Sequence, residues 1–361
     1  MRVLATARHP GAAEAVGPVV DALRTQGHEV LLIGVENQAP ENKTLGGSAA
    51  IFQRAGTEFV EFFETRPDHG VVNVPASYAS DLVRTFAPDR VLVGCSSAKN
   101  LTSPAIEEAL IVAGVNASMR TVRIVEAWGV WRRVPRTPNA DGWAVLDDIT
   151  STTMAAQGAP CDRIAITGHP GLDGYANADT PRSPELRAEL GLDGFRAILF
   201  FGQTQDSDTA RAPYEALEWV LDCIRPGDRL VFARHPRDTQ DYGALRERSR
   251  GRMIEPRIDS HRLLAAADVC ISQYSTMALK SALLGIPTIS ITHPNDFPEL
   301  REACGGIPLC VSGGSREADS PGRLHKLLQG EPVAGASTLK ASINVDGRST
   351  QRVVELLTRD D

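Results

Sequence analysis

Apolar runs of strand length alternate along the chain with longer segments in which apolar residues recur at helical spacing. A short run that is apolar at nearly every position is typical of a strand buried on both faces of a parallel sheet. The helical segment Ala12–Thr25 places Val16, Val19 and Leu23 on one face. Predicted strands of the first half are Arg2–Thr6, Glu29–Gly34, Arg90–Gly94, Arg120–Glu126, Trp143–Leu146 and Arg163–Thr167, with a further helix over Pro104–Ala113. This alternation predicts an α/β fold.

A segment rich in Gly, Pro, Asp and Asn, residues 171–195, divides the pattern into two halves and predicts a hinge. A second α/β set follows it. Its predicted strands are Arg196–Phe201, Arg229–Ala233, Val269–Ser272 and Thr288–Ile291, and its predicted helices are Ala212–Ile224, Ser260–Ala267 and Ser275–Leu284. We therefore predict two Rossmann-like domains, residues 1–170 and 196–345, facing each other across a cleft, with an amphipathic C-terminal helix in residues 346–361 that packs back on the first domain.

Composition and charge exclude several classes of structure and binding partner. The 361 residues are 42% hydrophobic and 23% charged, which argues against wholesale disorder. The net charge of −7 argues against nucleic acid as a general partner, because a sequence-independent grip on nucleic acid needs a strongly basic face. No apolar run reaches the roughly 18 residues that span a bilayer. The six cysteines lack C-x-x-C spacing, so we expect a cytoplasmic protein without a metal site.

The strongest candidate site lies in the second half. One predicted strand runs into Arg234-His235, and another leads through Gln273-Tyr274 into Ser275-Thr276 at the start of a helix. Backbone N–H groups at a helix start, together with the helix dipole, favour an anion, and such a site suits the diphosphate of a nucleotide sugar. Arg234 and His235 can add donors. The alternative is that Ser275 only caps its helix and His235 lies on the surface.

With these motifs in place, the chain resembles the two-domain glycosyltransferase B fold, which includes the UDP-N-acetylglucosamine 2-epimerases. The His-Pro after one strand and the Ser-Thr after another resemble bacterial sialyl- and capsule-type transferases. The segments that carry the resemblance are residues 1–34, PDRVLVGCSS, RIAITGHPGLD, ADVCISQYSTMALKSALLGIPTISI and NVDGRSTQRVVELL. The resemblance implies a nucleotide-sugar donor on the second domain and an acceptor on the first.

For the first domain, the resemblance makes the loop after the first strand a candidate for chemistry. Transfer with inversion needs a base for the acceptor proton, and a neutral imidazole such as His9 suits this role. Glu126 and Asp147 are the candidate orienting groups or alternative bases. The other interpretation is that Arg8 and His9 bind an anion or line the loop, and that Glu126 is a paired structural carboxylate.

For the second domain, two further groups of residues are candidates. Gly202 and Gln203 follow a strand, where a glycine lets backbone amides approach the donor phosphates, although such turns are also simple tight connections. In the resembling families, the segment HPNDFPEL faces the donor sugar, which implies sugar contacts from His293, Asp296 and Glu299. The same residues also occur in loops that bind no ligand.

The chain departs from these families at three places. Many members carry a Glu on the donor helix that binds ribose, whereas Lys280 stands at the corresponding place. Lysine accepts no hydrogen bond from ribose, so it either meets an acidic group or is solvated. The 2-epimerases place an Asp after the mid-domain strand, where this chain has Gly94-Cys95-Ser96-Ser97, and a His-Arg-rich loop where it has Phe201–Asp206. Only Val125-Glu126-Ala127 keeps the resemblance to their acidic site.

We therefore predict a glycosyltransferase that uses a nucleotide-sugar donor, a small-molecule or glycan acceptor and no metal or other cofactor. A UDP-N-acetylglucosamine 2-epimerase-like enzyme, hydrolysing or not, is the first alternative. A nucleotide-sugar-binding protein without turnover is the second. A homodimer stays open as the assembly state, and the sequence contains neither G-x-x-x-x-G-K-[ST] nor G-x-S-x-G.

Overall fold

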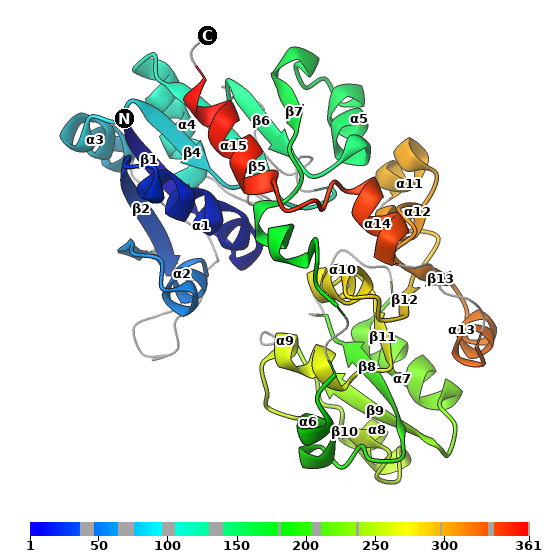
Figure 1. Cartoon of the computed structure of the whole chain (residues 1–361). Helices are drawn as coiled ribbons and strands as arrows, with labels where there is room; N and C mark the ends of the chain where they lie inside the picture. The colour runs from blue at the N-terminus through cyan, green and yellow to red at the C-terminus, as the bar shows by residue number, and fades with distance from the viewer. Residues whose placement is uncertain are drawn as a thin grey trace. The chain divides into compact units, whose positions relative to one another are not determined.

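The computed structural model describes residues 1–36, 47–63, 76–95, 105–129, 140–179, 182–203, 211–235, 238–296, 298–330 and 336–359. The chain forms two compact units, of which unit 1 contains Met1–Ala176 and Ile343–Asp361, and unit 2 contains Asn177–Ser342 (Figure 1). Unit 2 is thus inserted between two stretches of chain that build unit 1.

The described part of unit 1 contains a seven-stranded sheet in the order β3-β2-β1-β4-β5-β6-β7. Every neighbouring pair is parallel. The strands are β1 (Arg2–Ala7), β2 (Glu29–Glu36), β3 (Val60–Phe63), β4 (Arg90–Val93), β5 (Arg120–Val125), β6 (Gly142–Val145) and β7 (Ile164–Ile166). The chain adds β2 and β3 on one side of β1 and β4 to β7 on the other, so the order of addition reverses between β1 and β4.

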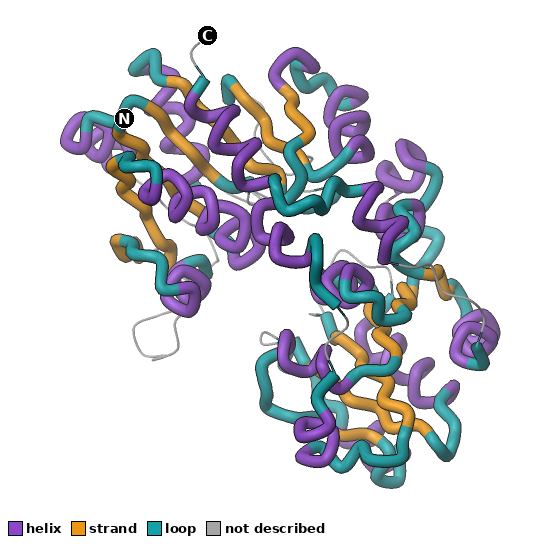
Figure 2. The backbone as a smooth tube through the Cα atoms, viewed as in Figure 1, coloured by secondary structure: helices purple, strands orange, loops and turns teal. Residues whose placement is uncertain are grey.

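Helices cover both faces of this sheet because its strands are apolar on both faces (Figure 2). In β1, Val3 and Ala5 pack with α1, α2 and α15, whereas Leu4 packs with α3, α4 and α5. Helices α1 and α15 lie side by side although they come from opposite ends of the chain (Figure 1). The helices are α1 (Pro10–Thr25), α2 (Ala49–Ala55), α3 (Ala76–Phe86), α4 (Ile106–Asn116), α5 (Asp148–Ala156) and α15 (Ser349–Thr358), with 3-10 turns at Cys161–Arg163 and Pro170–Tyr175.

Unit 2 has a described six-stranded parallel sheet in the order β10-β9-β8-β11-β12-β13. Its order of addition reverses between β8 and β11. The strands are β8 (Arg196–Phe201), β9 (Asp228–Ala233), β10 (Met253–Ile254), β11 (Val269–Ser272), β12 (Thr288–Ile291) and β13 (Arg316–Ala318).

The two faces of the second sheet are covered by different helices. Phe200 and Phe232 pack with α7, α8 and α13 on one face, and Leu199 and Val231 pack with α6, α9 and α10 on the other. The helices of unit 2 are α6 (Pro184–Glu189), α7 (Pro213–Cys223), α8 (Gly243–Arg248), α9 (Ser260–Leu263), α10 (Thr276–Leu283), α11 (Pro298–Cys304), α12 (Pro308–Val311), α13 (Pro321–Leu328) and α14 (Ala336–Ser342), with a 3-10 turn at Leu264–Ala266.

These sheets confirm the predicted α/β class with two Rossmann-like sheets. The predicted strands β8, β11 and β12 have the predicted bounds. The predicted hinge region differs in detail, because Pro170–Tyr175 is a 3-10 turn of unit 1 and Pro184–Glu189 is a helix of unit 2. Helix α15 packs on unit 1, where Val353 and Leu357 join the core beneath α1.

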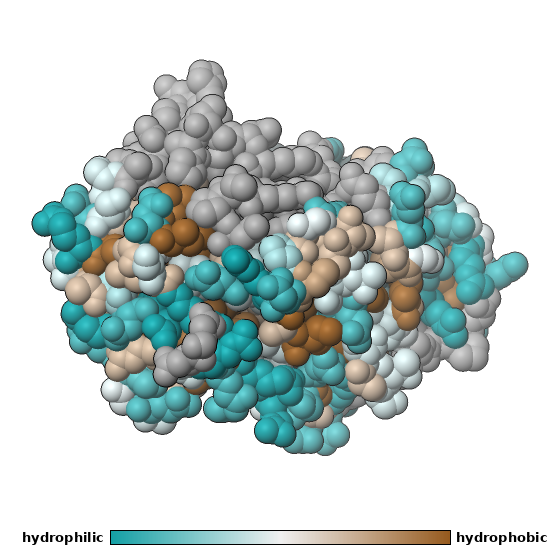
Figure 3. All heavy atoms as spheres, turned by 90° about the horizontal axis from the view of Figure 1, so that it is seen from above, coloured by the Kyte–Doolittle hydropathy of each residue, from teal (hydrophilic) through white to brown (hydrophobic). Residues whose placement is uncertain are grey.

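Few large hydrophobic side chains are exposed among the described residues. Val60 and Val311 are the large hydrophobic side chains that stand exposed there, at 51% and 48%. Figure 3 accordingly shows hydrophilic residues with small separate hydrophobic patches on the face that it presents. Among the described helices, none has the length and apolar character needed to cross a membrane.

Candidate functional site

The carboxyl ends of β1 and β4 mark the first candidate site. In open parallel sheets a ligand-binding crevice forms where the order of strands reverses, because the loops after the two strands diverge to opposite faces. In unit 1 these loops begin with Arg8-His9 after β1 and Gly94-Cys95 after β4. Glu126 directly follows β5, the neighbour of β4. The predicted catalytic residues His9 and Glu126 therefore lie at the same edge of one sheet.

Glu107, at the start of α4, ties these loops together. Its Oε1 accepts a hydrogen bond from the backbone N–H of Arg8 over 3.0 Å. A Cβ atom on Gly94 would lie 2.8 Å from this oxygen and 2.6 Å from Ala12 Cβ. Contacts this short leave room only for hydrogen at Gly94, which lets the first turn of α1 approach the end of β4. Glu107 itself is 1% exposed.

Glu126 is the most perturbed carboxyl at this edge. Burial, the largest cause, raises the pKa of Glu126 to about 8, with Glu107 raising it further, while backbone hydrogen bonds at Glu126 and Cys95 and the Arg123 charge counteract. Its Oε2 atom is buried and has no hydrogen-bond partner among the described residues. The side chain lies near the first turn of α1, because a Cβ on Gly11 would be 3.7 Å from Glu126 Cγ. At neutral pH this side chain is predominantly a neutral acid.

A buried ion pair lies in the same core. Arg123 Nη2 is 2.6 Å from Glu108 Oε1, with the two side chains 1% and 5% exposed. Burial raises the pKa of Cys95 well above its ordinary value, and Arg123 opposes this shift. Cys95 is thus a buried neutral thiol, since the thiolate is the reactive form and is disfavoured here.

His9 and Asp147 differ in what they can contribute. His9 occupies the N-cap position of α1 without capping it through its side chain, and its Nε2 lies 3.4 Å from Arg8 Nη1. Asp147 caps α5, where its Oδ1 accepts hydrogen bonds from the N–H and hydroxyl of Thr150, and its Oδ2 accepts one from Trp128 Nε1 over 2.7 Å. These contacts assign Asp147 to holding α5 and Trp128 in place.

The second candidate site is the equivalent edge of unit 2, at the carboxyl ends of β8 and β11. Gly202 and Gln203 follow β8. A Cβ on Gly202 would lie 2.9 Å from Phe232 Cε2 and 3.5 Å from the backbone nitrogen of His235. The glycine therefore keeps the loop after β8 against the loop after β9, which begins with Arg234-His235.

Ser275 and Thr276 begin α10 at this edge. Ser275 is the N-cap, and its Oγ accepts a hydrogen bond from the backbone N–H of Met277 over 3.1 Å. The Ser275 N–H in turn donates to Ser272 Oγ at the end of β11. Thr276 is exposed. The Ser275 side chain therefore caps the helix, as the alternative interpretation of the sequence stated. An anion at this position would be attracted by the dipole of α10.

Arg234 and His235 follow β9 and differ in their surroundings. The Arg234 guanidinium donates to the Gln240 carbonyl, lies 3.7 Å from carboxylate oxygens of Asp238 and Glu255, and stacks over Tyr242 at 5.1 Å. These contacts hold Arg234 within its own loop. His235 is half-buried, and its carbonyl accepts from the Asp238 N–H. Pro236 lies outside the described residues, as do Thr204 to Asp206.

The predicted sugar-contacting segment follows β12. Asp296, 1% exposed, accepts hydrogen bonds at Oδ2 from the Tyr274 hydroxyl over 2.9 Å and from the His293 N–H over 2.6 Å. Asp296 thereby joins this loop to the loop after β11. His293 is half-buried, and its Nδ1 accepts from the Asn295 N–H. Glu299 lies in α11, and its side chain is outside the described residues.

Lys280 is buried rather than solvated. It is 5% exposed, and its Nζ lies 3.3 Å from His261 Nε2 on α9. This position on the buried face of α10 assigns it to packing between two helices. No group of three or more His, Cys, Asp or Glu side chains in the described ranges has an arrangement that could hold a metal ion.

Three buried charged residues of unit 1 were not predicted from the sequence: Glu107, Glu108 and Arg123. A signal was present, because two adjacent acids open the mostly apolar helix IEEALIVAGV, and Arg123 stands between Val122 and Ile124 in the strand RTVRIV. A charge between apolar residues that are buried indicates a buried pair.

Solved structures resemble the whole chain. S. aureus MnaA, determined with UDP, is 14% identical, and the match covers 100% of this chain and 98% of that one with a TM-score of 0.67. The UDP-GlcNAc 2-epimerase of Methanocaldococcus jannaschii, in complex with UDP-GlcNAc and UDP, is 14% identical over 99% of both chains, TM-score 0.63. The glycotransferase of kitacinnamycin is 15% identical over 98% of this chain and 97% of that one, TM-score 0.61.

No protein-family model and no curated protein sequence matches this chain. At identities of 14 to 15%, the structural likeness establishes the fold alone. The chain therefore has the two-domain glycosyltransferase B fold that its motifs resemble.

Proposed function

We propose that the protein is an enzyme acting on a nucleotide sugar, in which unit 2 binds the nucleotide diphosphate and unit 1 supplies proton transfer through Glu126. The main support is Glu126, whose burial raises its pKa to about 8. It lies at the carboxyl edge of the unit 1 sheet, where the strand order reverses between β1 and β4. Perturbed carboxyls in such places are candidates for acid–base chemistry. The likeness to structures of UDP-GlcNAc 2-epimerases makes inversion of a sugar carbon the first candidate reaction.

Inversion at carbon 2 of a sugar must break and remake the bond between that carbon and hydrogen. The proton leaves one face of the carbon and a proton is added to the opposite face, so inversion needs one group for each step. A group in either role works best when its pKa lies near the working pH. With a pKa of about 8, Glu126 is protonated for the most part at pH 7, and the carboxylate is the minor form. Glu126 is therefore suited to one of these two proton transfers at neutral pH.

The proposed binding of the nucleotide to unit 2 rests on the geometry of its sheet edge. The edge at β8 and β11 combines the dipole of α10 with a glycine loop that packs against the backbone of His235. A diphosphate placed there meets backbone N–H groups without a bulky side chain at position 202. Ser275 contributes by holding the first turn of α10, and Thr276 offers an exposed hydroxyl.

Glycosyl transfer is the second candidate, and one residue favours it. Cys95 stands where the 2-epimerases that the chain resembles place an aspartate, and burial keeps its thiol neutral. A chain without that carboxylate has one acid–base group fewer for carbon-2 chemistry. Transfer needs a single base for the acceptor hydroxyl, for which His9 or Glu126 suffices.

An experiment without acceptor separates the two reactions. We would incubate the protein with UDP-GlcNAc in D2O and follow carbon 2 by proton NMR. Inversion predicts deuterium at carbon 2 and a second epimer. Transfer predicts neither with or without an acceptor, and predicts instead release of UDP and a glycosylated product once an acceptor is added. Glu126→Gln should lower the exchange rate by about 10² to 10⁴. The control is Glu58→Gln, an exposed glutamate of the same unit. Equal rates in wild type and Glu126→Gln would remove Glu126 from the reaction.

A further inference from the structure

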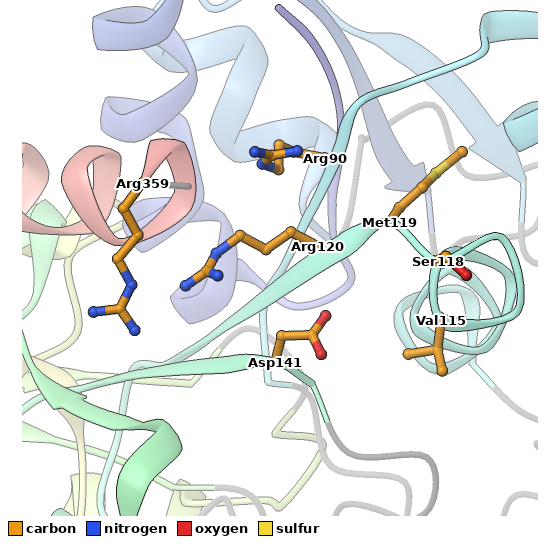
Figure 4. Close-up of a pocket in the computed structure, with 7 residues that line it drawn as sticks. All are labelled: Arg90, Val115, Ser118, Met119, Arg120, Asp141 and Arg359. Carbon is orange, nitrogen blue, oxygen red and sulfur yellow. The ribbon is translucent and has the colours of Figure 1, made fainter. Parts of the chain in front are cut away.

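A cavity of about 300 Å³ opens in unit 1 where β4, β5 and β6 begin (Figure 4). Arg90 starts β4, Arg120 starts β5, Arg359 follows α15, and all three line the cavity. Asp141, the residue before β6, is the one acidic side chain among its lining residues. Because all strands of a parallel sheet start at the same edge, this cavity lies at the edge opposite Glu126.

Two of the arginines are held in place by helix α15. Arg90 Nε donates a hydrogen bond to the Leu357 carbonyl over 3.3 Å, and Arg120 Nε donates to the Leu356 carbonyl over 3.2 Å. The positive side chains thus meet the negative end of the α15 dipole. Arg120 is 8% exposed, so its guanidinium is a fixed charge at the wall of the cavity.

The rest of the lining is partly apolar and partly polar. In Figure 4 the guanidinium groups stand on one side of the view, and Val115, Ser118 and Met119 stand on the other. The Asp141 carboxylate is fixed by Thr121, whose N–H and hydroxyl donate to its Oδ2 over 2.8 and 2.9 Å. A ligand here meets three positive charges, one carboxylate and a small apolar wall.

We propose that this cavity binds a small organic phosphate that carries hydroxyl groups. A guanidinium presents planar, parallel donors that match phosphate oxygens, which makes arginine the side chain of choice for this anion. Three arginines against one aspartate leave the cavity positive. The volume is at the lower end of the range of small-molecule sites, which fits a monosaccharide phosphate. We assign the Asp141 Oδ1 atom to a ligand hydroxyl.

Binding at this cavity also concerns the last helix of the chain. Arg90 and Arg120 contact both the cavity and the final carbonyls of α15. A phosphate that orders these guanidinium groups stabilises the docked position of α15, because a ligand that binds only the docked form shifts the equilibrium toward it. The backbone amides of α15 therefore report on occupancy.

The test uses the full chain with glucose 6-phosphate and inorganic phosphate as the two probes, measured by calorimetry. We expect saturable binding of glucose 6-phosphate, at least about tenfold tighter than inorganic phosphate. Arg359→Gln should weaken it about tenfold or more, because a hydrogen bond to a charged group carries roughly that factor. Arg84→Gln is the matched control, since Arg84 is an exposed arginine of the same unit that pairs with Asp81. Hydrogen exchange at α15 should slow with glucose 6-phosphate.

Three results would overturn the proposal. The first is no saturable binding of glucose 6-phosphate at millimolar concentration. The second is an affinity that Arg359→Gln and Arg84→Gln leave equally unchanged. The third is equal affinity for both probes, which would make the cavity a site for plain phosphate. The Arg359 backbone N–H donates a hydrogen bond to the Glu355 carbonyl, and substitution of the side chain keeps this bond, so the fold should stay intact.

Discussion

Arg123 and Glu108 form an ion pair of 2.6 Å in the core of unit 1, where their side chains are 1% and 5% exposed. The pair joins β5 to α4 and lies in the core that also holds Cys95. A buried charge costs several kcal/mol unless it is paired, so each of the two residues depends on the other.

The first prediction concerns this pair. Arg123→Met leaves Glu108 without its partner in the core and should lower the free energy of unfolding by about 3 to 5 kcal/mol. The double variant Glu108→Leu/Arg123→Met should recover most of this loss, because no unpaired charge is left. Urea denaturation of the four chains gives the coupling. A double variant as unstable as the sum of the single changes would show that the pair is not coupled.

The second prediction concerns the pH dependence of stability. Glu126 has a pKa of about 8 in the folded chain against an ordinary value of 4.5. Between these values the folded chain keeps a proton that the unfolded chain has lost, so the contribution of Glu126 to the free energy of unfolding falls as the pH rises. Glu126→Gln removes this fall. Its advantage over wild type should therefore grow between pH 5 and pH 8, by at most about 1.4 kcal/mol per pH unit.

Denaturation midpoints at pH 5, 6.5 and 8 measure this difference. Glu58→Gln should show a constant offset over the same range, because Glu58 is exposed. A Glu126→Gln offset that is equally constant would mean that the Glu126 pKa is not raised.

The third prediction tests the close approach at the end of β4. Gly94→Ala places a methyl group 2.6 Å from Ala12 Cβ and 2.8 Å from Glu107 Oε1, both of which are packed. Overpacking of this kind costs about 1 to 3 kcal/mol of stability. It should also displace Glu107 from the Arg8 N–H and so lower turnover. Gly174→Ala is the control, because nothing lies within 4 Å of a Cβ there. Thermal unfolding and the exchange assay give the two readouts.

The fourth prediction separates capping from anion binding at α10. Ser275→Asp keeps an N-cap acceptor, so stability should stay within about 0.5 kcal/mol, but the new negative charge should weaken UDP binding about tenfold or more. Ser275→Ala should lose about 1 kcal/mol of stability. Ser320→Asp, at the N-cap of α13, is the matched control for UDP binding. UDP affinity that is unchanged in Ser275→Asp would place the diphosphate elsewhere.

The sequence predicted the buried strands well and the peripheral helices poorly. The runs RAILFF, VCIS and TISI are buried at nearly every position, and mostly apolar, because both faces of each strand are covered. Helices such as α2 and α13 are short, at seven and eight residues, and they bury only two and three side chains, so a helical pattern has few positions in which to show itself. Their positions depend on contacts from distant parts of the chain.

The candidate sites show the same division. The positions of His9 and Ser275 followed from strand ends and helix starts, which are local features. The hydrogen bond of Asp296 with Tyr274 and the ion pairs of Arg234 with Asp238 and Glu255 depend on how the loops fold. The spacing of these residues in the sequence does not predict them. The Glu126 pKa depends on burial by elements that are distant in the chain.

Because α15 closes the core over β5 and β6 and contacts α1, unit 1 lacks part of its interior until residues 349–358 leave the ribosome. Unit 2 has by then emerged whole. During synthesis the N-terminal domain of a protein usually folds first. Here we expect unit 2 to fold before unit 1, because unit 1 cannot complete its core until α15 has been made.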